Sequence, residues 1–237
     1  MPITAQGTTV VIWSFEDASG NISTQAQNVI INDGTLPVAD ALALTDLTDE
    51  CAIASLVPPT ATDNCIGSIT GTTATVLPIT AQGTTVITWT YDDGNGNVSS
   101  QTQNVIIDDV SSPDPDVQSL ADVTAECEIS SLNAPTATDN CAGSITGSHD
   151  ASLPITTQGT TVVTWTYNDG NGNVSTQTQN VIIDDVSTPV PDVQNLADVR
   201  AECEISSLSA PTATDNCAGS ITGSHNASLP ITVQGTT

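Results

Sequence analysis

Residues 159–167 read Gly-Thr-Thr-Val-Val-Thr-Trp-Thr-Tyr, and this stretch decides the fold. Its side chains alternate with a period of two, which places Val163, Trp165 and Tyr167 on one face of a β-strand. The turn sequence Asp-Gly-Asn-Gly-Asn follows at 169–173, and residues 174–183 are again rich in Thr, Val and Ile. The pattern predicts a β-hairpin with one aromatic face directed toward a core.

The hairpin recurs at a step of 76 residues, which puts Trp13, Trp89 and Trp165 in equivalent places. The string Pro-Ile-Thr-x-Gln-Gly-Thr-Thr keeps the same step and begins at Pro2, Pro78, Pro154 and Pro230. A period of this length is too long for one coil of a solenoid and suits one small domain per repeat.

The fold class follows from the rest of the repeat. Residues 196–203 and 210–214 have the composition of short strands between Ser-rich loops, and no window has a helical period. We expect an all-β protein of tandem immunoglobulin-like β-sandwiches, about seven strands to each repeat of 76 residues, that form an extended rod. All six aromatic residues lie on the hairpin strands, and we expect them in the core rather than on a sugar-binding platform.

Proline and acidic residues at 108–116 and 184–192 mark the connections between repeats. This register makes 35–110 and 111–186 complete immunoglobulin-like repeats, 1–34 the C-terminal half of a repeat, and 187–237 the N-terminal part of a further one. Neither end piece is large enough to bury a core alone. Either the chain is a slice of a longer array, or the ends of different chains complement each other.

Each repeat register holds two cysteines 14 positions apart, which predicts one disulfide within each repeat. A bond that closes a loop of about 15 residues contributes about 3 kcal/mol, and it places the chain in an oxidising compartment. Zinc is the weaker reading because no CxxC occurs. The predicted disulfide residues are Cys51, Cys65, Cys127, Cys141, Cys203 and Cys217.

The chain carries 27 acidic residues and one basic residue, Arg200, for a net charge of −26. This balance excludes a groove for nucleic acid and an attraction to anionic membranes. No apolar run is long enough for a transmembrane helix, so we expect no direct membrane insertion. The expected partners are neighbouring repeats of the same chain and, for a binding module, a surface polysaccharide or a cell-surface receptor.

Some of the acidic residues recur at the hairpin tips and at the linkers of successive repeats. The last strand of a sandwich ends at the pole that faces the next repeat, so the tip at 169–173 should approach the linker at 108–109 and residues 139–140. Carboxylates packed without a basic partner favour a divalent cation, which predicts calcium at the junctions. The alternative is a plain tight turn with solvated aspartates. The predicted ligands are Asp93, Asn95, Asn97, Asp108, Asp109, Asp139, Asn140, Asp169, Asn171, Asn173, Asp184 and Asp185.

Four motifs in order resemble the hyalin repeat, an immunoglobulin-like module of extracellular adhesion proteins. They are Thr-Ala-Thr-Asp-Asn-Cys at 136–141, the strand at 159–167, the turn at 169–173, and Asp-Asp-x-x-x-Pro at 184–189. The acidity and the near-identical copies also resemble the giant surface adhesins of gliding Bacteroidota. One departure is that the family often has a cysteine in the last strand, where this chain has Gln177 and Gln179.

The resemblance implies a secreted structural protein and not an enzyme. Ser148-His149 and Ser224-His225 lack an orienting acid and a nucleophile elbow, and the first repeat has Thr72-Thr73 there. We therefore expect a stalk or filament segment of an extracellular, cell-surface adhesin that serves adhesion or gliding motility. The alternative is a module that binds carbohydrate or protein directly through its acidic loops. A stalk sets a distance and can be built from identical copies, whereas recognition needs one differentiated site. The near-identity of the repeats therefore favours the stalk.

Overall fold

A computed structural model describes residues 2–233 and 235 of the chain. Within this part every regular element is a β-strand, and none of the chain described there forms a helix that could span a membrane. The chain divides into two compact units, Met1–Ser111 and Ser112–Thr237. This division falls one residue after the expected end of a repeat at 110. The expected boundaries at 34 and 186 stay predictions.

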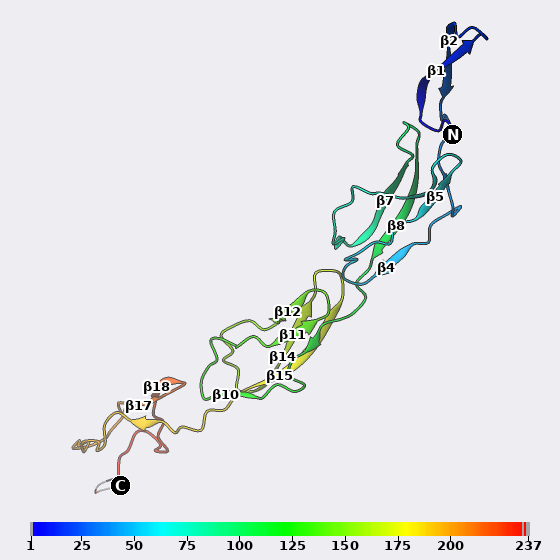
Figure 1. The fold of residues 1–237 in the computed structure, drawn as a ribbon. Coiled ribbons are helices and arrows are strands. Elements are labelled where there is room, and N and C mark those ends of the chain that lie inside the picture. The colour runs from blue at the N-terminus through cyan, green and yellow to red at the C-terminus, as the bar shows by residue number, and fades with distance from the viewer. Residues whose placement is uncertain (1, 234, 236–237) are drawn as a thin grey trace. The chain divides into compact units, whose positions relative to one another are not determined.

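The first unit holds a hairpin and a complete sandwich (Figure 1). The hairpin pairs β1 (Gly7–Glu16) with β2 (Ile22–Ile31) in antiparallel register. One sheet of the sandwich has the order β3 (Val38–Ala39), β5 (Thr60–Asp63), β6 (Gly67–Thr70). The other has the order β4 (Leu47–Asp49), β8 (Val98–Ile107), β7 (Gly83–Asp92), with β4 parallel to β8.

The second unit repeats this plan and then begins it again. Its first sheet has the order β12 (Gly143–Thr146), β11 (Thr136–Asp139), β9 (Asp114–Pro115). Its second sheet has the order β10 (Val123–Ala125), β15 (Val174–Ile183), β14 (Gly159–Asn168), β13 (Ser148–His149). A third sheet follows, made of β16 (Val190–Pro191), β17 (Thr212–Asp215) and β18 (Gly219–Thr222). Residues 112–186 thus supply seven strands, and the expected all-β sandwich is confirmed.

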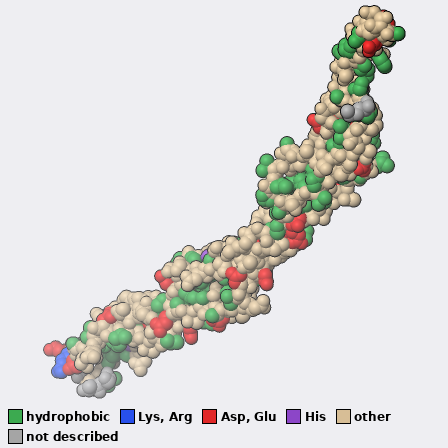
Figure 2. All heavy atoms as spheres, in the orientation of Figure 1, with side chains coloured by type: hydrophobic (Ala, Val, Ile, Leu, Met, Phe, Trp, Pro, Cys, Tyr) green, Lys and Arg blue, Asp and Glu red, His purple; other side chains and the backbone are tan. Residues whose placement is uncertain are grey.

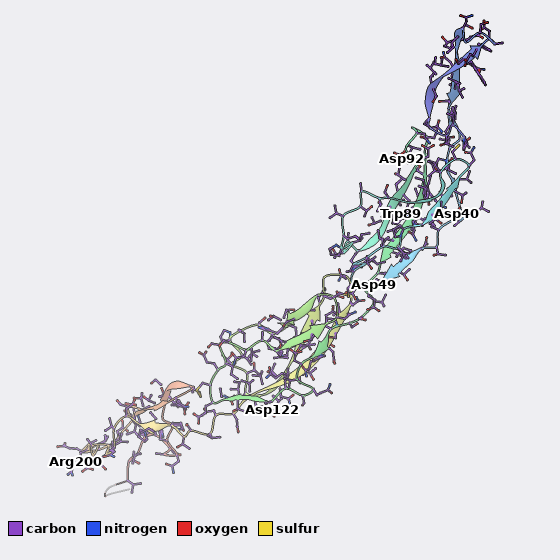
Figure 3. The ribbon with its side chains drawn as sticks, in the orientation of Figure 1. Asp40, Asp49, Trp89, Asp92, Asp122 and Arg200 are labelled. Carbon is purple, nitrogen blue, oxygen red and sulfur yellow. A yellow bond between two sulfur atoms is a disulfide. The ribbon has the colours of Figure 1, made fainter. Side chains whose placement is uncertain are left out.

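Each complete sandwich has one core, and the alternating strand supplies most of it. In the second unit Val163, Trp165 and Tyr167 are at most 1% exposed, whereas Val162 on the opposite face is 58% exposed. Trp89 (Figure 3) occupies the same place in the first unit and is 2% exposed. The facing sheets contribute smaller residues, and the matching positions in the two cores are Ala61 and Ala137, Ile69 and Ile145, Ile79 and Ile155.

Glutamines tie the aromatic rings to the other half of the same repeat. The Trp89 Nε1–H donates to Gln103 Oε1 at 3.0 Å, and the Gln103 amide donates to the carbonyl of Thr45 at 2.8 Å. The Tyr91 hydroxyl donates to Gln101, whose amide donates to the carbonyl of Ala41. The second unit makes the same bonds with Gln177 and Gln179, so two glutamines of the last strand form a polar bridge in each complete repeat.

The two end pieces differ from the expectations. Trp13 and Phe15 are 53% and 55% exposed, so the prediction that all six aromatics lie in a core is wrong for this hairpin. No N-terminal half of a repeat packs against it within the described residues. Likewise Leu196–Cys203 forms no strand, whereas the equivalent β10 pairs with β15 of its own repeat.

Candidate functional site

The hairpin tips fold around an aspartate. Asp93 Oδ1 accepts the backbone N–H groups of Asn95 at 2.8 Å and Asn97 at 3.1 Å, and its Oδ2 accepts the Asn97 amide at 2.6 Å. Gly94 and Gly96 take φ values of 78° and 101°, which L side chains disfavour, so the Asn-Gly alternation is a requirement of this turn. The tip at 169–173 makes equivalent bonds to Asp169.

Hydrogen bonding sets the ionisation of the tip aspartates. Desolvation disfavours the charged form of Asp93, but the side-chain amide of Asn97 and the backbone N–H groups of Asn95 and Asn97 outweigh it and lower the pKa of this carboxyl. The pKa of Asp169 is lowered in the same way.

Acidification should therefore remove a stabilising contribution of the tips. A carboxyl whose pKa is depressed in the folded chain stabilises the fold above its unfolded pKa, about 3.9 for Asp. The contribution is lost as the pH falls through the folded pKa of Asp93, hence below about pH 4. A carbon-13 NMR titration of the Asp93 carboxyl measures this directly. A midpoint at or above the ordinary value for Asp contradicts the assignment.

The tip of the β7–β8 hairpin reaches the end of β2, the last strand of the preceding repeat. The Asn95 amide donates to Asp33 Oδ2 at 3.2 Å, and the Asn97 amide donates to the Asp33 carbonyl at 3.2 Å. Asp33 and Asp63 each offer a carboxylate oxygen within 4.8 Å of the other and of Cys65 Sγ. We call Asp33, Asp63, Asp93, Asn95 and Asn97 the junction cluster.

The three aspartates of the junction cluster are buried. Asp33, Asp63 and Asp93 are 8%, 4% and 5% exposed. Asp63 Oδ1 accepts the N–H groups of Cys65 and Ile66, but its Oδ2 is buried and has no hydrogen-bond partner among residues 2–233 and 235. Desolvation and the neighbouring carboxylates of Asp33, Asp63 and Asp93 raise the pKa of the Cys65 thiol. A buried carboxylate oxygen without a donor is a ready ligand for a cation.

Asp33 and Asp63 were missing from the predicted ligands, although Asp109 and Asp139, one period later, were among them. The 76-residue step was the signal that identifies them. Two periods after Asp33 and Asp63, Asp185 and Asp215 of successive repeats also offer oxygens within 4.8 Å of each other and of Cys217 Sγ.

The other predicted ligands lie at the ends of strands. Asp108 and Asp109 follow β8, Asp139 ends β11 and Asn140 follows it, Asp169–Asn173 follow β14, and Asp184 and Asp185 follow β15. The backbone N–H groups of Asp108 and Asp184 donate to the carbonyls of Asp49 and Ala125. An approach of the tip at 169–173 to residues 108–109 stays a prediction, and so does metal binding by any of these residues.

The predicted disulfide pairing is wrong. Cys127 bonds to Cys217 of the next repeat, with a Cα–Cα distance of 5.0 Å, and not to Cys141. Strand direction explains this. β10 runs parallel to the last strand of its sandwich and delivers Cys127 to the C-terminal pole. β11 runs antiparallel to the first strand, β9, and delivers Cys141 to the N-terminal pole. Two cysteines close in sequence thus lie at opposite poles of one repeat.

Hydrogen bonds surround this inter-repeat disulfide. The Asn216 amide donates to Glu126 Oε2 at 2.5 Å, and the Ser187 hydroxyl donates to the same oxygen at 3.2 Å. Cys51 and Cys141 are also disulfide-bonded, whereas Cys65 and Cys203 are free thiols in the described part of the chain. Disulfides are typical of oxidising compartments and indicate a secreted protein.

Comparisons with known proteins agree with these features. Residues 111–183 match the family described as the HYR-like domain with 4 cysteines. Hyalin of Lytechinus variegatus is 30% identical over 235 residues, which cover 88% of this chain and 43% of that protein. Hyalin of Strongylocentrotus purpuratus is 34% identical over 238 residues, which cover 89% of this chain and 20% of that protein. These matches support a hyalin-repeat family.

The matches cover only part of each relative. The chain spans less than half the length of either hyalin. Among solved structures, protocadherin gamma B2 extracellular cadherin domains 1-5 shares 16% identity with a TM-score of 0.30, over 88% of this chain and 51% of that one. The family match covers a repeat that holds Cys127 and Cys141, two cysteines of the four in its description.

Proposed function

We propose that this chain is a segment of the structural stalk of a secreted, cell-surface adhesin. The observation that carries the proposal is the Cys127–Cys217 bond, which joins one repeat to the next rather than closing a loop within a repeat. A covalent tie between successive domains transmits tension and resists separation. Such a tie suits a protein that spaces a binding tip away from a surface.

The acidic loops support the stalk over direct ligand binding. Asn95 and Asn97, which a binding module would present to its ligand, instead bond to Asp33 of the preceding repeat. We therefore expect no binding of the full chain to surface polysaccharides on a glycan array. Binding that is lost in Asp169→Asn would favour the binding module. Gliding motility and attachment to one particular surface are expectations from the sequence that this proposal does not need.

We further propose that calcium binds the junction cluster. Asp33 and Asp63 bring two carboxylates within 4.8 Å of each other, and Asn95 and Asn97 of the Asp93 tip bond to Asp33. The chain has a single basic side chain, Arg200, which bonds to Asp198. The buried Asp63 Oδ2 has no hydrogen-bond partner among the described residues, and a bound cation would satisfy it. Calcium takes six to eight oxygen ligands, so side-chain oxygens of Asn95 and Asn97 and water would complete the shell.

Calcium should raise the melting temperature of the chain, and a chelator should lower it. A ligand at 100 times its Kd stabilises the folded state by about 2.7 kcal/mol. Differential scanning calorimetry with 5 mM calcium, with magnesium, and with EGTA measures the response. Asp63→Asn keeps the side-chain shape and removes the charge, so it should abolish most of the shift that arises in the first unit.

The matched control is Glu16→Gln, which removes an exposed carboxylate from the same unit. It should leave the calcium response unchanged. Identical melting curves with calcium and with EGTA would refute the calcium proposal. They would leave the stalk proposal standing, because the latter depends on the inter-repeat disulfide.

A further inference from the structure

One residue distinguishes two otherwise identical stretches of the repeats. Residues 134–156 and 210–232 have the same sequence one period apart, except that Asn226 stands in the place of Asp150. The change creates the tripeptide Asn226-Ala227-Ser228, which has the Asn-x-Ser pattern of an acceptor for N-linked glycans. Three more tripeptides of this pattern begin at Asn21, Asn97 and Asn173. The structure separates these four candidate sites.

The other three tripeptides begin at hairpin tips, where the asparagine side chain is already in use. In each tip the amide nitrogen donates to an aspartate four residues earlier, and the backbone N–H of the same asparagine donates to the other oxygen of that carboxylate. The amide-to-carboxylate pairs are Asn21 to Asp17 at 2.8 Å, Asn97 to Asp93 at 2.6 Å, and Asn173 to Asp169 at 2.6 Å. A hydrogen bond to a charged group withholds the nitrogen by roughly a factor of ten or more.

The hydroxyl groups of two tip tripeptides are engaged as well. The Ser99 hydroxyl donates to the carbonyl of Pro37 at 2.7 Å, and the Ser175 hydroxyl donates to that of Pro113 at 2.6 Å. The hydroxyl is part of the acceptor pattern, so these bonds hold a second required group inside the fold. The tips at Asn97 and Asn173 are therefore poor acceptors.

Asn226 lies in a different setting. It belongs to residues 223–230, which form no strand between the end of β18 and the bridge that Ile231 makes with Ile205. Asn226 and Ser228 are both exposed. The Asn226 side chain makes no hydrogen bond with the part of the chain that the structure describes. Its amide nitrogen is available to an enzyme.

The second complete repeat shows that this loop stays accessible when a hairpin packs on the sheet. Asp150, in the place of Asn226, accepts the Thr164 N–H through Oδ1 at 2.8 Å. Asp150 and Ser152 are exposed nevertheless. An asparagine in this place can accept the same bond with its amide oxygen, which leaves its amide nitrogen to solvent. The accessibility of Asn226 thus does not require that its sheet be uncovered.

The surface of the protein also suits a glycan. Most atoms visible in Figure 2 belong to the backbone or to uncharged polar side chains. A hydrated glycan can lie over such a surface without burying charge. It would cover backbone in a loop, and exposed loops are the usual places of proteolytic cleavage.

We propose that Asn226 accepts an N-linked glycan, and that the three asparagines of the tips do not. The donor is an oligosaccharide on a polyprenyl pyrophosphate, and the catalyst is the oligosaccharyltransferase of the secreting cell. The amide nitrogen forms a bond to C1 of the first sugar. The bond from C1 to the pyrophosphate oxygen breaks, the pyrophosphate leaves with the electron pair, and the amide gives one proton to a base. The proposal goes beyond the stalk function and depends on neither calcium nor the inter-repeat disulfide.

Glycan mapping of the full chain, secreted from mammalian cells, tests the choice of site. Peptide N-glycosidase F in water labelled with oxygen-18 converts each glycosylated asparagine into a labelled aspartate, which mass spectrometry locates. We expect the label at Asn226, with an occupancy roughly tenfold or more above that of Asn97 and Asn173. An unlabelled Asn226 overturns the proposal, and so does equal labelling of the four sites.

Two variants test the role of the loop. Asp150→Asn copies the tripeptide of Asn226 into the second complete repeat, and it should add a second glycan to the chain. Ser228→Ala keeps the acceptor asparagine and removes the hydroxyl, so it should abolish the label at Asn226. A chain with Asp150→Asn that gains no glycan would refute the inference that this loop is an acceptor in a complete repeat.

A third variant tests the shielding of the tips. Asp17→Ala removes the acceptor of the Asn21 amide and should bring the label to Asn21. Glu16→Gln changes the preceding residue and should not. If neither variant labels Asn21, its bond to Asp17 is not what excludes the glycan, and the proposed basis of selection fails. These substitutions lie outside the junction cluster, so the results are independent of the calorimetric test of calcium.

Discussion

Replacing Trp89 with alanine should lower the free energy of unfolding of the first unit by about 3–5 kcal/mol, the usual cost of a large-to-small change in a core. Trp89 is 2% exposed, packs in the core of the sandwich, and holds Gln103 through its Nε1–H. The change empties the centre of the core and leaves the buried Gln103 without one partner. Urea unfolding followed by far-UV circular dichroism measures the loss.

The chain contains its own control for this experiment. Trp13→Ala removes the same residue from the equivalent strand position, but Trp13 is 53% exposed. Its cost should stay within about 0.5 kcal/mol, as for other surface changes. Equal losses for Trp13→Ala and Trp89→Ala would show that the hairpin β1–β2 is covered in solution and that the half-repeat description is wrong.

The sequence was sufficient to predict the hairpins and, in the two complete repeats, their buried face. Alternation over 159–167 determines which side chains share a face, and the aromatic residues identify the face that enters the core. Residues of the copies at 83–91 obey the same rule. This information is local, because a strand's two faces differ by one residue in sequence and a tight turn fixes the pairing of its neighbour.

The partner of each cysteine was not predictable from spacing. Cys127 and Cys141 are 14 residues apart, and spacing alone favours a bond between them. The direction of β10 and β11 decides the outcome, since β10 pairs parallel with β15 and β11 pairs antiparallel with β9. The parallel pairing joins residues nearly 60 positions apart, and a strand of three residues leaves no periodic signal of it.

The candidate site was predictable in part. Composition identified the Asp-Gly-Asn-Gly-Asn tips, and topology placed them near the end of the preceding repeat, as the bonds from Asn95 and Asn97 to Asp33 show. The unpartnered oxygen of Asp63 was not predictable, because it results from the way Oδ1 of the same carboxylate caps the turn at Cys65 and Ile66. Whether a buried oxygen finds a hydrogen-bond donor depends on the folded geometry around it and not on the residue type.

Removing the disulfide with Cys127→Ser/Cys217→Ser should destabilise the second unit by about 4–5 kcal/mol in the chain-entropy account of crosslinks. The bond spans 90 positions, and a large closed loop restricts the unfolded chain strongly. It also tethers residues 187–233, whose strands in the described part of the chain form a single three-stranded sheet, β16–β17–β18. We expect this segment to become the first site of proteolysis in the variant. Urea unfolding and limited proteolysis measure the two effects.

Cys203→Ser is the matched control, because it removes a free thiol from the same unit and should leave stability unchanged. The pairing itself is tested by peptide mapping without reduction. Trypsin is of little use on a chain with one basic residue, but cleavage at its 27 acidic residues separates all six cysteines. Recovery of a Cys127–Cys217 peptide is expected. Recovery of Cys127 linked to Cys141 would mean that each repeat is closed on itself, and the tension-bearing stalk would then lose its basis.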